Sequence, residues 1–453
     1  MASHIIRWST SSAERRRAVL TRNNCATGTG GSNQLTEGIR SLIDDVQDRG
    51  DSALVDALQK FDSVDTPNLR VSAEDFVAAE NAISDELSAA IDVSIERIRA
   101  FNNEIVARAS WNTTTADGTV LGEIARPLES VGLFVPSGKG AFPSVLLQTG
   151  VPAITAGVTD IQVVVPPVPG SGGQVDPATL VVASRLGITD VYCLNGPSGI
   201  AALALGTETV RPVRKIVGPG SPPVALAQQL VQTFGVSIVG GLGPTDSLVI
   251  ADETAEVRYL AADVINEAEH GPDSSAVLVS PNRVLLEATE AEILRQLSQL
   301  PQPRRDYAMT SIFTNGGLIV ADSMPQALEI ANDYAAEHIQ FATADPRGLL
   351  EQLRFAGTAL LGQHTTFAGS NFVIGTPATL PTTGFAKQNS GVTAHTYLNI
   401  ISTAEVDEKV ASSLGPAIMA FADYEGFPAH GRSVTVRSDP ASSAPASTEE
   451  TFR

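Results

Sequence analysis

The middle of the chain repeats a short strand–helix unit, and this repeat constrains the possible fold more than any other feature. Residues 157–161 (Gly-Val-Thr-Asp-Ile) and 187–191 (Gly-Ile-Thr-Asp-Val) each lead into an apolar run, and their starts are 30 residues apart. That spacing is about the length of one βα unit. Apolar segments at 215–217 and 236–239 continue the series, with helical stretches between them. Short apolar strands alternating with helices indicate a parallel sheet covered on both faces.

A second series of apolar strands follows, at 247–250, 276–279, 317–320 and 339–342. Before the first series, residues 34–109 have apolar side chains at helical spacing. We therefore expect two α/β domains, one of which interrupts the other in the sequence.

The predicted domain limits follow from these two series. One domain comprises residues 30–130 with 245–385, and the second comprises 131–244. An N-terminal extension (1–29), a C-terminal helical dimerisation segment (386–437) and a polar tail rich in Ser, Ala, Pro and Glu (438–453) complete the chain. The composition of the tail predicts disorder.

The composition excludes several classes of partner and location. A formal net charge of −20 argues against nucleic acid or an anionic membrane as the main partner, because both favour a basic face. No run approaches the roughly 20 apolar residues of a membrane span. The only cysteines, Cys25 and Cys193, indicate neither a disulfide framework nor a zinc cage of thiolates. We therefore expect a soluble protein in a reducing compartment, the cytoplasm.

Three segments place a carboxylate beside a histidine: 265–275, 332–338 and 424–430. In the first, Glu267 and His270 are three residues apart, so on a helix they share a side and could bind one cation. Imidazole also suits proton transfer at neutral pH, because the pKa of the histidine side chain is close to neutral pH. These segments are the candidate site.

The three segments, in this order, resemble the histidinol dehydrogenase family. Further matching stretches lie at 131–138, 200–207, 215–220 and 248–252, and the resemblance runs from Arg7 to about Arg437. It implies an α/β fold of two incomplete Rossmann-like, doubly wound domains with helical N- and C-terminal extensions. It also implies a homodimer whose active site is completed across the interface.

The resemblance further implies a divalent metal ion, Zn²⁺ or a similar cation. The family holds it with a glutamine, two histidines and an aspartate, which correspond here to Glu267, His270, His430 and Asn371. The partner chain of the dimer would donate His430. The amide and the carboxylate have exchanged places, so the set still contains two imidazoles, one carboxylate and one amide oxygen, all suitable for zinc. We therefore expect the metal to be retained; the alternative is that Glu267 only pairs with His270.

Glu337 and His338 match the acid–base pair of the family without change. The imidazole would remove a hydroxyl proton as hydride leaves the carbinol carbon. The neighbouring carboxylate would orient it or activate water for a second oxidation. Thr245 and Glu425 correspond to substrate-binding positions.

The cofactor and substrate positions depart from the family pattern. The residues that would contact NAD are Phe134, Ser198 and Ser221, where the family has a tyrosine, a glutamine and an asparagine. At the substrate, Pro377 and Ala378 replace an asparagine and a histidine. Because a pocket that lacks hydrogen-bond partners rejects the substrate that needs them, these changes predict an alcohol other than histidinol.

The function predicted from the sequence is thus a metal-dependent, NAD-linked oxidation of a small-molecule alcohol, on a substrate other than histidinol. The first alternative is authentic oxidation of L-histidinol. A non-redox, metal-dependent isomerase or lyase would keep Glu337, His338 and the metal without using NAD. A catalytically silent family member would tolerate the loss of both residues.

Overall fold

The computed structural model describes residues 4–22, 33–137 and 140–438. Cys25 and the predicted disordered tail, apart from Ser438, lie outside the described residues. The chain divides into two units. The first unit comprises Met1–Val106 with Pro127–Leu398, and the second comprises Ala107–Arg126 with Asn399–Arg453.

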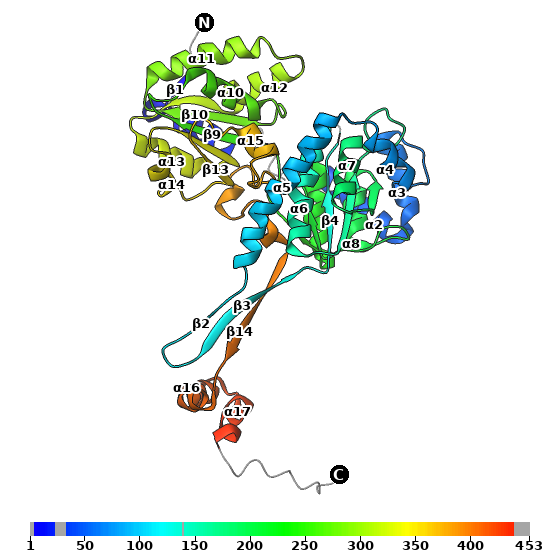
Figure 1. Ribbon diagram of the computed structural model, residues 1–453, viewed down its shortest axis with the longest axis vertical. Coiled ribbons are helices and arrows are strands. Elements are labelled where there is room, and N and C mark those ends of the chain that lie inside the picture. Colours follow the sequence, from blue (N-terminus) through cyan, green and yellow to red (C-terminus); the bar gives the residue numbers. More distant parts are fainter. Residues whose placement is uncertain (1–3, 23–32, 138–139, 439–453) are drawn as a thin grey trace. The chain divides into compact units, whose positions relative to one another are not determined.

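The first unit contains a six-stranded sheet whose strands all run parallel (Figure 1). In spatial order the strands are β1 (Ile5–Arg7), β11 (Gly317–Val320), β10 (Ser275–Ser280), β9 (Asp246–Ala251), β12 (His338–Ala342) and β13 (Thr358–Leu361).

Both faces of this sheet are buried, as a parallel sheet requires. Alternate side chains of β9 point to opposite faces, so that Val249 joins one apolar cluster while Leu248 and Ile250 join the other. Helices of the first unit that lie around this sheet are α1 (Ala13–Thr21), α10 (Val257–Ala268), α11 (Arg283–Leu297), α12 (Arg304–Thr310), α13 (Met324–Tyr334), α14 (Pro346–Leu350) and α15 (Phe367–Phe372).

The second sheet of the first unit has five parallel strands. In spatial order they are β6 (Val191–Cys193), β5 (Asp160–Val165), β4 (Ser130–Phe134), β7 (Lys215–Val217) and β8 (Ser237–Ile238). Val163 and Val165 pack into one apolar cluster and Val164 into the other, again because neighbouring side chains alternate. The helices that follow its strands are α6 (Pro143–Ala156), α7 (Pro177–Arg185), α8 (Gly196–Leu205) and α9 (Pro222–Val231).

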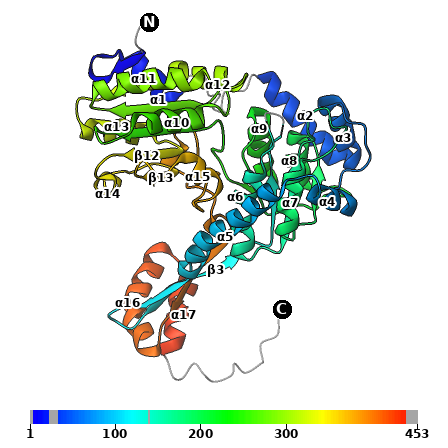
Figure 2. The same cartoon turned by 45° about the horizontal axis from the view of Figure 1, so that its top comes forward.

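The helices before the first strand series also cover the five-stranded sheet. They are α2 (Asn33–Arg49), α3 (Asp51–Ala57), α4 (Ala73–Glu80) and α5 (Asp85–Arg108). The apolar stripe of α2, including Ile39, Ile43 and Val46, packs in one cluster with residues of α8 and α9 (Figure 2).

This packing differs from the predicted grouping of residues 30–130 with 245–385. Ile91, Ile95 and Ile98 of α5 share a cluster with strands of the five-stranded sheet, not with those of the six-stranded sheet. Helical periodicity shows that a helix has an apolar face but does not specify which sheet that face covers. The domain limits as such stay a prediction.

The second unit contains a three-stranded sheet and two helices. The sheet has the order β14 (Leu398–Glu405), β3 (Val120–Pro127) and β2 (Trp111–Thr114), with β2 antiparallel to β3. Helices α16 (Glu408–Glu425) and α17 (Pro428–Ser438) pack against each other. The segment 386–437, expected to be helical, therefore includes the eight-residue strand β14.

No helix among the described residues is both long enough and apolar enough to cross a membrane.

Candidate active site

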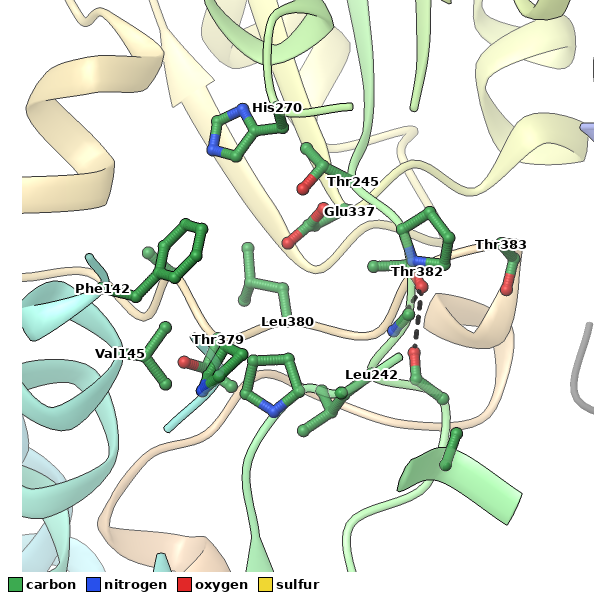
Figure 3. Close-up of a pocket in the computed structure, with 18 of the residues that line it drawn as sticks. Phe142, Val145, Leu242, Thr245, His270, Glu337, Thr379, Leu380, Thr382 and Thr383 are labelled. Atoms are coloured by element: carbon green, nitrogen blue, oxygen red, sulfur yellow. Dashed lines mark hydrogen bonds between the residues drawn. The ribbon is translucent and has the colours of Figure 1, made fainter. Parts of the chain in front are cut away.

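A cavity of about 490 Å³ within the first unit is lined by segments of both parallel sheets (Figure 3). On one side are residues after strands β4, β7 and β8, so the five-stranded sheet contributes its carboxyl edge. On the other side are residues just before β9, β10 and β12, so the six-stranded sheet contributes its amino edge. Glu337, Thr245 and His270 gather at this second side, and Phe142 and Val145 lie across the cavity from them.

Glu337 and His338 are placed where α13 ends and β12 begins. Ala335 ends α13 in the left-handed region, with φ of 50°, and the chain then turns into the sheet. Both side chains line the cavity although their residues are only 6% and 1% exposed. His338 Nε2 lies 3.8 Å from Glu337 Oε1, and the buried His338 Nδ1 has no hydrogen-bond partner among the described residues.

Burial sets the protonation of this pair. It lowers the pKa of His338, although the negative charges of Glu267 and Asp246 act in the opposite direction. Burial also raises the pKa of Glu337 well above its ordinary value, and repulsion by Asp246 and Glu267 adds to this effect. A neutral imidazole can accept a proton, so the site holds a base that is ready at neutral pH.

Asp246, which was not predicted from the sequence, forms two hydrogen bonds with Glu337. Its Oδ1 accepts a hydrogen bond from Glu337 N at 2.8 Å, and its own N–H donates to Glu337 Oε2 at 3.2 Å. Asp246 is completely buried. The available signal was an acid two residues before the apolar run that starts at Leu248, because a buried carboxylate at the start of a buried strand needs a specific partner.

Three of the four predicted metal ligands meet in the first unit. Glu267 lies in the last turn of α10 and is 1% exposed, His270 follows the same helix, and Asn371 lies at the end of α15. Asn371 Nδ2 donates to Glu267 Oε1 at 2.8 Å, so the two exchanged residues are direct neighbours. His270 Nδ1 lies 3.2 Å from Glu267 O and 3.7 Å from Glu267 Oε2.

These residues fit a divalent cation. If His270 Nδ1 donates to the carbonyl of Glu267, Nε2 is left free as a ligand. The amide oxygen of Asn371 is likewise left for a cation, because its nitrogen donates to Glu267. Within the described ranges no three His, Cys, Asp or Glu residues group closely enough to bind a metal by themselves. The fourth predicted ligand, His430, is exposed in α17 of the second unit, where its ring stacks on Phe427 at 5.0 Å.

The cofactor side fits contacts through the backbone better than through side chains. Of the three predicted NAD contacts, Ser221 is exposed and lines the cavity, whereas Phe134 and Ser198 are buried. Ser198 Oγ donates to Asn195 O at 3.2 Å within the first turn of α8. Gly220 also lines the cavity, and a Cβ atom there would collide with Val224, so the conformation of this turn requires glycine.

The substrate side combines one predicted polar residue with an apolar wall. Thr245 lines the cavity, as do Ala378, Leu380, Phe142 and Val145. The second predicted substrate residue, Glu425, is exposed at the end of α16 in the second unit.

Gln148 of α6, which was not predicted from the sequence, bonds to the end of α15 at Asn371 and to the following loop at Ala378. Its Oε1 accepts from Ala378 N at 3.2 Å and its Nε2 donates to Asn371 O at 3.4 Å. The available signal was a long amide side chain in helix 143–156, whose other polar residues are all small hydroxyl side chains.

Comparison with known proteins gives one consistent result. The family model described as histidinol dehydrogenase matches residues 27–438. A histidinol dehydrogenase from Deinococcus radiodurans is 41% identical over 400 residues, which cover 88% of this chain and 90% of that protein. A protein of Colwellia psychrerythraea named histidinol dehydrogenase homolog is 36% identical over 406 residues, covering 89% of this chain and 90% of its own length.

The fold agrees with the sequence match. The crystal structure of histidinol dehydrogenase from Elizabethkingia anophelis superimposes with a TM-score of 0.89 at 31% identity, covering 97% of this chain and 99% of that one. The resemblance and the α/β fold predicted from the sequence are thereby confirmed. With a family model that spans most of its length and relatives of this similarity, the chain belongs to the histidinol dehydrogenase family.

Proposed function

We propose that this chain is an NAD-linked dehydrogenase that oxidises L-histidinol. The observation that carries the proposal is the buried pair Glu337–His338, which lines one cavity together with Glu267, His270 and Asn371. The relatives named histidinol dehydrogenase favour this substrate over the different alcohol that the altered pocket led us to expect. The first alternative from the sequence thus becomes the preferred one.

His338 acts as the base that accepts the hydroxyl proton of the alcohol. Burial lowers its pKa, so the imidazole is neutral and able to accept a proton when substrate arrives. Burial raises the pKa of Glu337 and so favours its neutral form, in which the carboxyl group can donate a hydrogen bond or a proton to a neighbouring oxygen. Thr245 supplies a hydroxyl for orientation of the substrate from the start of β9.

The histidinol dehydrogenase family uses NAD and Zn²⁺. When bound, NAD accepts the hydride, and the metal draws electron density from the hydroxyl oxygen. We assign Glu267, His270 and Asn371, together with His430, to the metal, and the backbone at 219–221 with Ser221 to NAD. Phe134 and Ser198 would contribute to the cofactor region by packing under it.

The proposal includes a homodimer in which the second unit of one chain completes the site of the other. Its support is the apolar surface of α16, where Ile418, Phe421 and Tyr424 are 40%, 68% and 92% exposed. Contiguous exposed apolar side chains of this kind mark an interface. Glu425 and His430, the substrate and metal residues predicted for this unit, directly follow that surface in the sequence. We place the enzyme in the reducing cytoplasm, in keeping with the free, buried thiol of Cys193.

The test is turnover of L-histidinol by the purified, zinc-loaded protein with NAD. We expect NADH to form in step with loss of histidinol, with kcat/KM on the order of 10⁴ M⁻¹s⁻¹ or higher. The ratio of NADH to histidinol consumed counts the oxidation steps. Product without NADH would support the isomerase or lyase alternative, and the absence of any product would support a silent protein.

A second candidate function, oxidation of a less polar alcohol, is favoured by one specific feature. Ala378, where the family has a histidine, belongs to an apolar wall with Phe142, Val145 and Leu380. If histidinol is turned over poorly, Ala378→His should raise kcat/KM for histidinol by about 10-fold or more, because a site that bonds a polar substrate discriminates strongly. The matched control is Ala378→Leu, which adds bulk without a hydrogen-bonding group.

A further inference from the structure

Arg22, from the N-terminal extension, is buried and bonds to Asp246, which in turn bonds to Glu337 of the acid–base pair. The residue is 1% exposed, and its NH2 donates to Asp246 Oδ1 at 3.1 Å. The same nitrogen donates to Ala335 O at 3.4 Å, and the guanidinium lies 3.6 Å from the centroid of the Tyr334 ring. Arg22 thus contacts the end of α13 from which the chain continues to Glu337 and His338.

Asp246 connects Arg22 to two other segments of the site, at Glu337 and at Thr383. Its Oδ1 accepts from Arg22 and from Glu337 N, and its Oδ2 accepts from Thr383 N at 2.5 Å. The carboxylate is fully buried and accepts three hydrogen bonds, so its position is fixed by donors from three separate segments. The guanidinium is its only partner of full positive charge in the described part of the chain. Removal of that charge would leave a buried carboxylate uncompensated, which is strongly unfavourable.

Backbone strain is concentrated at the same cluster. Four non-glycine residues in the described ranges have positive φ, and three of them are Arg22, Ala335 and Thr383, at 47°, 50° and 52°. Each of the three bonds to Asp246 or to the guanidinium. Strained backbone persists only where the surrounding contacts enforce it, and such places are common at functional sites.

We propose that Arg22 is a positioning residue for catalysis: through Asp246 it fixes Glu337, and with it the start of β12 that carries His338. This inference rests on the proposed function, because Glu337 and His338 must do the proton transfer. It assigns to the N-terminal extension a role in the reaction that its distance in sequence from the site does not suggest.

The experiment compares Arg22→Met and Arg22→Lys with the control Ile293→Ala. Ile293 is fully buried in α11, so its truncation lowers the melting temperature without touching the Arg22 cluster. We expect Arg22→Met to lower kcat for histidinol by about 10- to 100-fold with little change in KM, because a small misplacement of catalytic groups has this effect. Arg22→Lys should recover part of the rate, and Ile293→Ala should keep the wild-type kcat.

A second measurement does not depend on the substrate. Amide hydrogen exchange at Glu337 and Thr383, whose N–H groups bond to Asp246, should accelerate in Arg22→Met and not in Ile293→Ala. Failure of wild-type enzyme to oxidise histidinol would refute the proposed function, and the exchange rates would still decide the role of Arg22. Unchanged exchange, or a kcat equal to that of the control, overturns the inference. If Arg22→Met does not fold, Arg22→Lys carries the same test, with accelerated exchange expected at the same two amides.

Discussion

The two parallel sheets of the first unit meet the cavity with opposite edges. The five-stranded sheet contributes its carboxyl edge, where β4 and β7 end and α6 and α9 begin. Ligands of open α/β sheets ordinarily bind at this edge. The six-stranded sheet contributes its amino edge, where α10 and α13 end and β10 and β12 begin.

The two edges suit ligands of opposite charge. Helix N-termini carry partial positive charge and free N–H groups, which suit the phosphates of a dinucleotide. Helix C-termini carry partial negative charge, which suits a cation, and Glu267 lies in the last turn of α10. The amino edge also carries the buried side chains at the starts of strands, such as His338, to which we assign the proton transfer. Under the proposed function, side chains therefore determine catalysis at the amino edge, whereas backbone geometry determines cofactor binding at the carboxyl edge.

The largest effect is expected at the amino edge, at His338. His338→Asn keeps a polar group of similar size but removes the base, so kcat should fall by about 10²–10⁴-fold. Steady-state turnover measures this, and circular dichroism should show an intact fold. A variant with near-normal kcat would mean that the base lies elsewhere and that the contrast between the edges is wrong.

The second-largest effect, on zinc affinity, is expected at the metal site. The contact between Glu267 and Asn371 allows the two positions to be tested as a pair. Glu267→Gln removes the only carboxylate of the predicted metal ligands. Asn371→Asp places a second carboxylate next to Glu267, where Asn371 Nδ2 now lies 2.8 Å from Glu267 Oε1. Glu267→Gln should weaken zinc binding by about 10- to 100-fold. Asn371→Asp should not weaken it, because the repulsion between two carboxylates favours the cation-bound state. The double variant Glu267→Gln, Asn371→Asp should recover most of the affinity, because it restores one carboxylate and one amide.

Zinc titration with a competing chelator measures all three variants on one scale. Recovery in the double variant is the informative outcome. If the double variant binds as weakly as the worse single variant, the two positions do not act as one exchanged pair.

Much of this site could be predicted from the sequence, for physical reasons that differ by residue. Glu337 and His338 are adjacent in the chain, and Glu267 and His270 are separated by less than a helical turn, so local patterning brings each pair together. Arg22 and Asp246 are 224 residues apart, and their pairing depends on how β1 and α1 join the six-stranded sheet. No periodicity in the sequence carries that information.

The same distinction between local and long-range contacts applies to the fold. Alternation of apolar strands and helices predicted two parallel α/β sheets, because a parallel sheet must be covered on both faces. The sequence predicted that α2 and α5 belong with the strands of 245–385, but both pack on the five-stranded sheet, since an amphipathic helix can pack against any apolar surface. Ser198 was predicted from alignment to contact NAD, but the sequence could not reveal that its hydroxyl bonds within α8.

A smaller effect concerns Asp263, a buried acid on α10 that lies one helical turn before Glu267. Burial raises its pKa from 3.8 to about 6, although Gln340 Nε2 donates to its Oδ2 at 2.8 Å. A raised folded-state pKa means that stability is fully present below pH 3.8 and is lost as the pH rises toward 6. Asp263→Asn should therefore add about 1–2 kcal/mol to the free energy of unfolding above pH 6 and nothing below pH 4.

Urea unfolding of metal-free protein at both pH values measures this difference. The metal must be removed because a cation near Glu267 would favour the ionised form of Asp263. A gain that is equal at the two pH values would show that the effect is not electrostatic.

The smallest effects are expected from side chains at the carboxyl edge. Ser221→Ala and Ser198→Ala should change KM for NAD by less than about 3-fold, because one hydroxyl is exposed and the other already bonds within its own helix. Gly220→Ala should raise KM for NAD by about 10-fold, because its Cβ would collide with Val224 and displace the turn that lines the cavity. NADH formation at varied NAD measures all three, with kcat as the internal control. If Ser221→Ala instead has the larger effect, NAD is held by side chains at this edge as well, and the division between the two edges disappears.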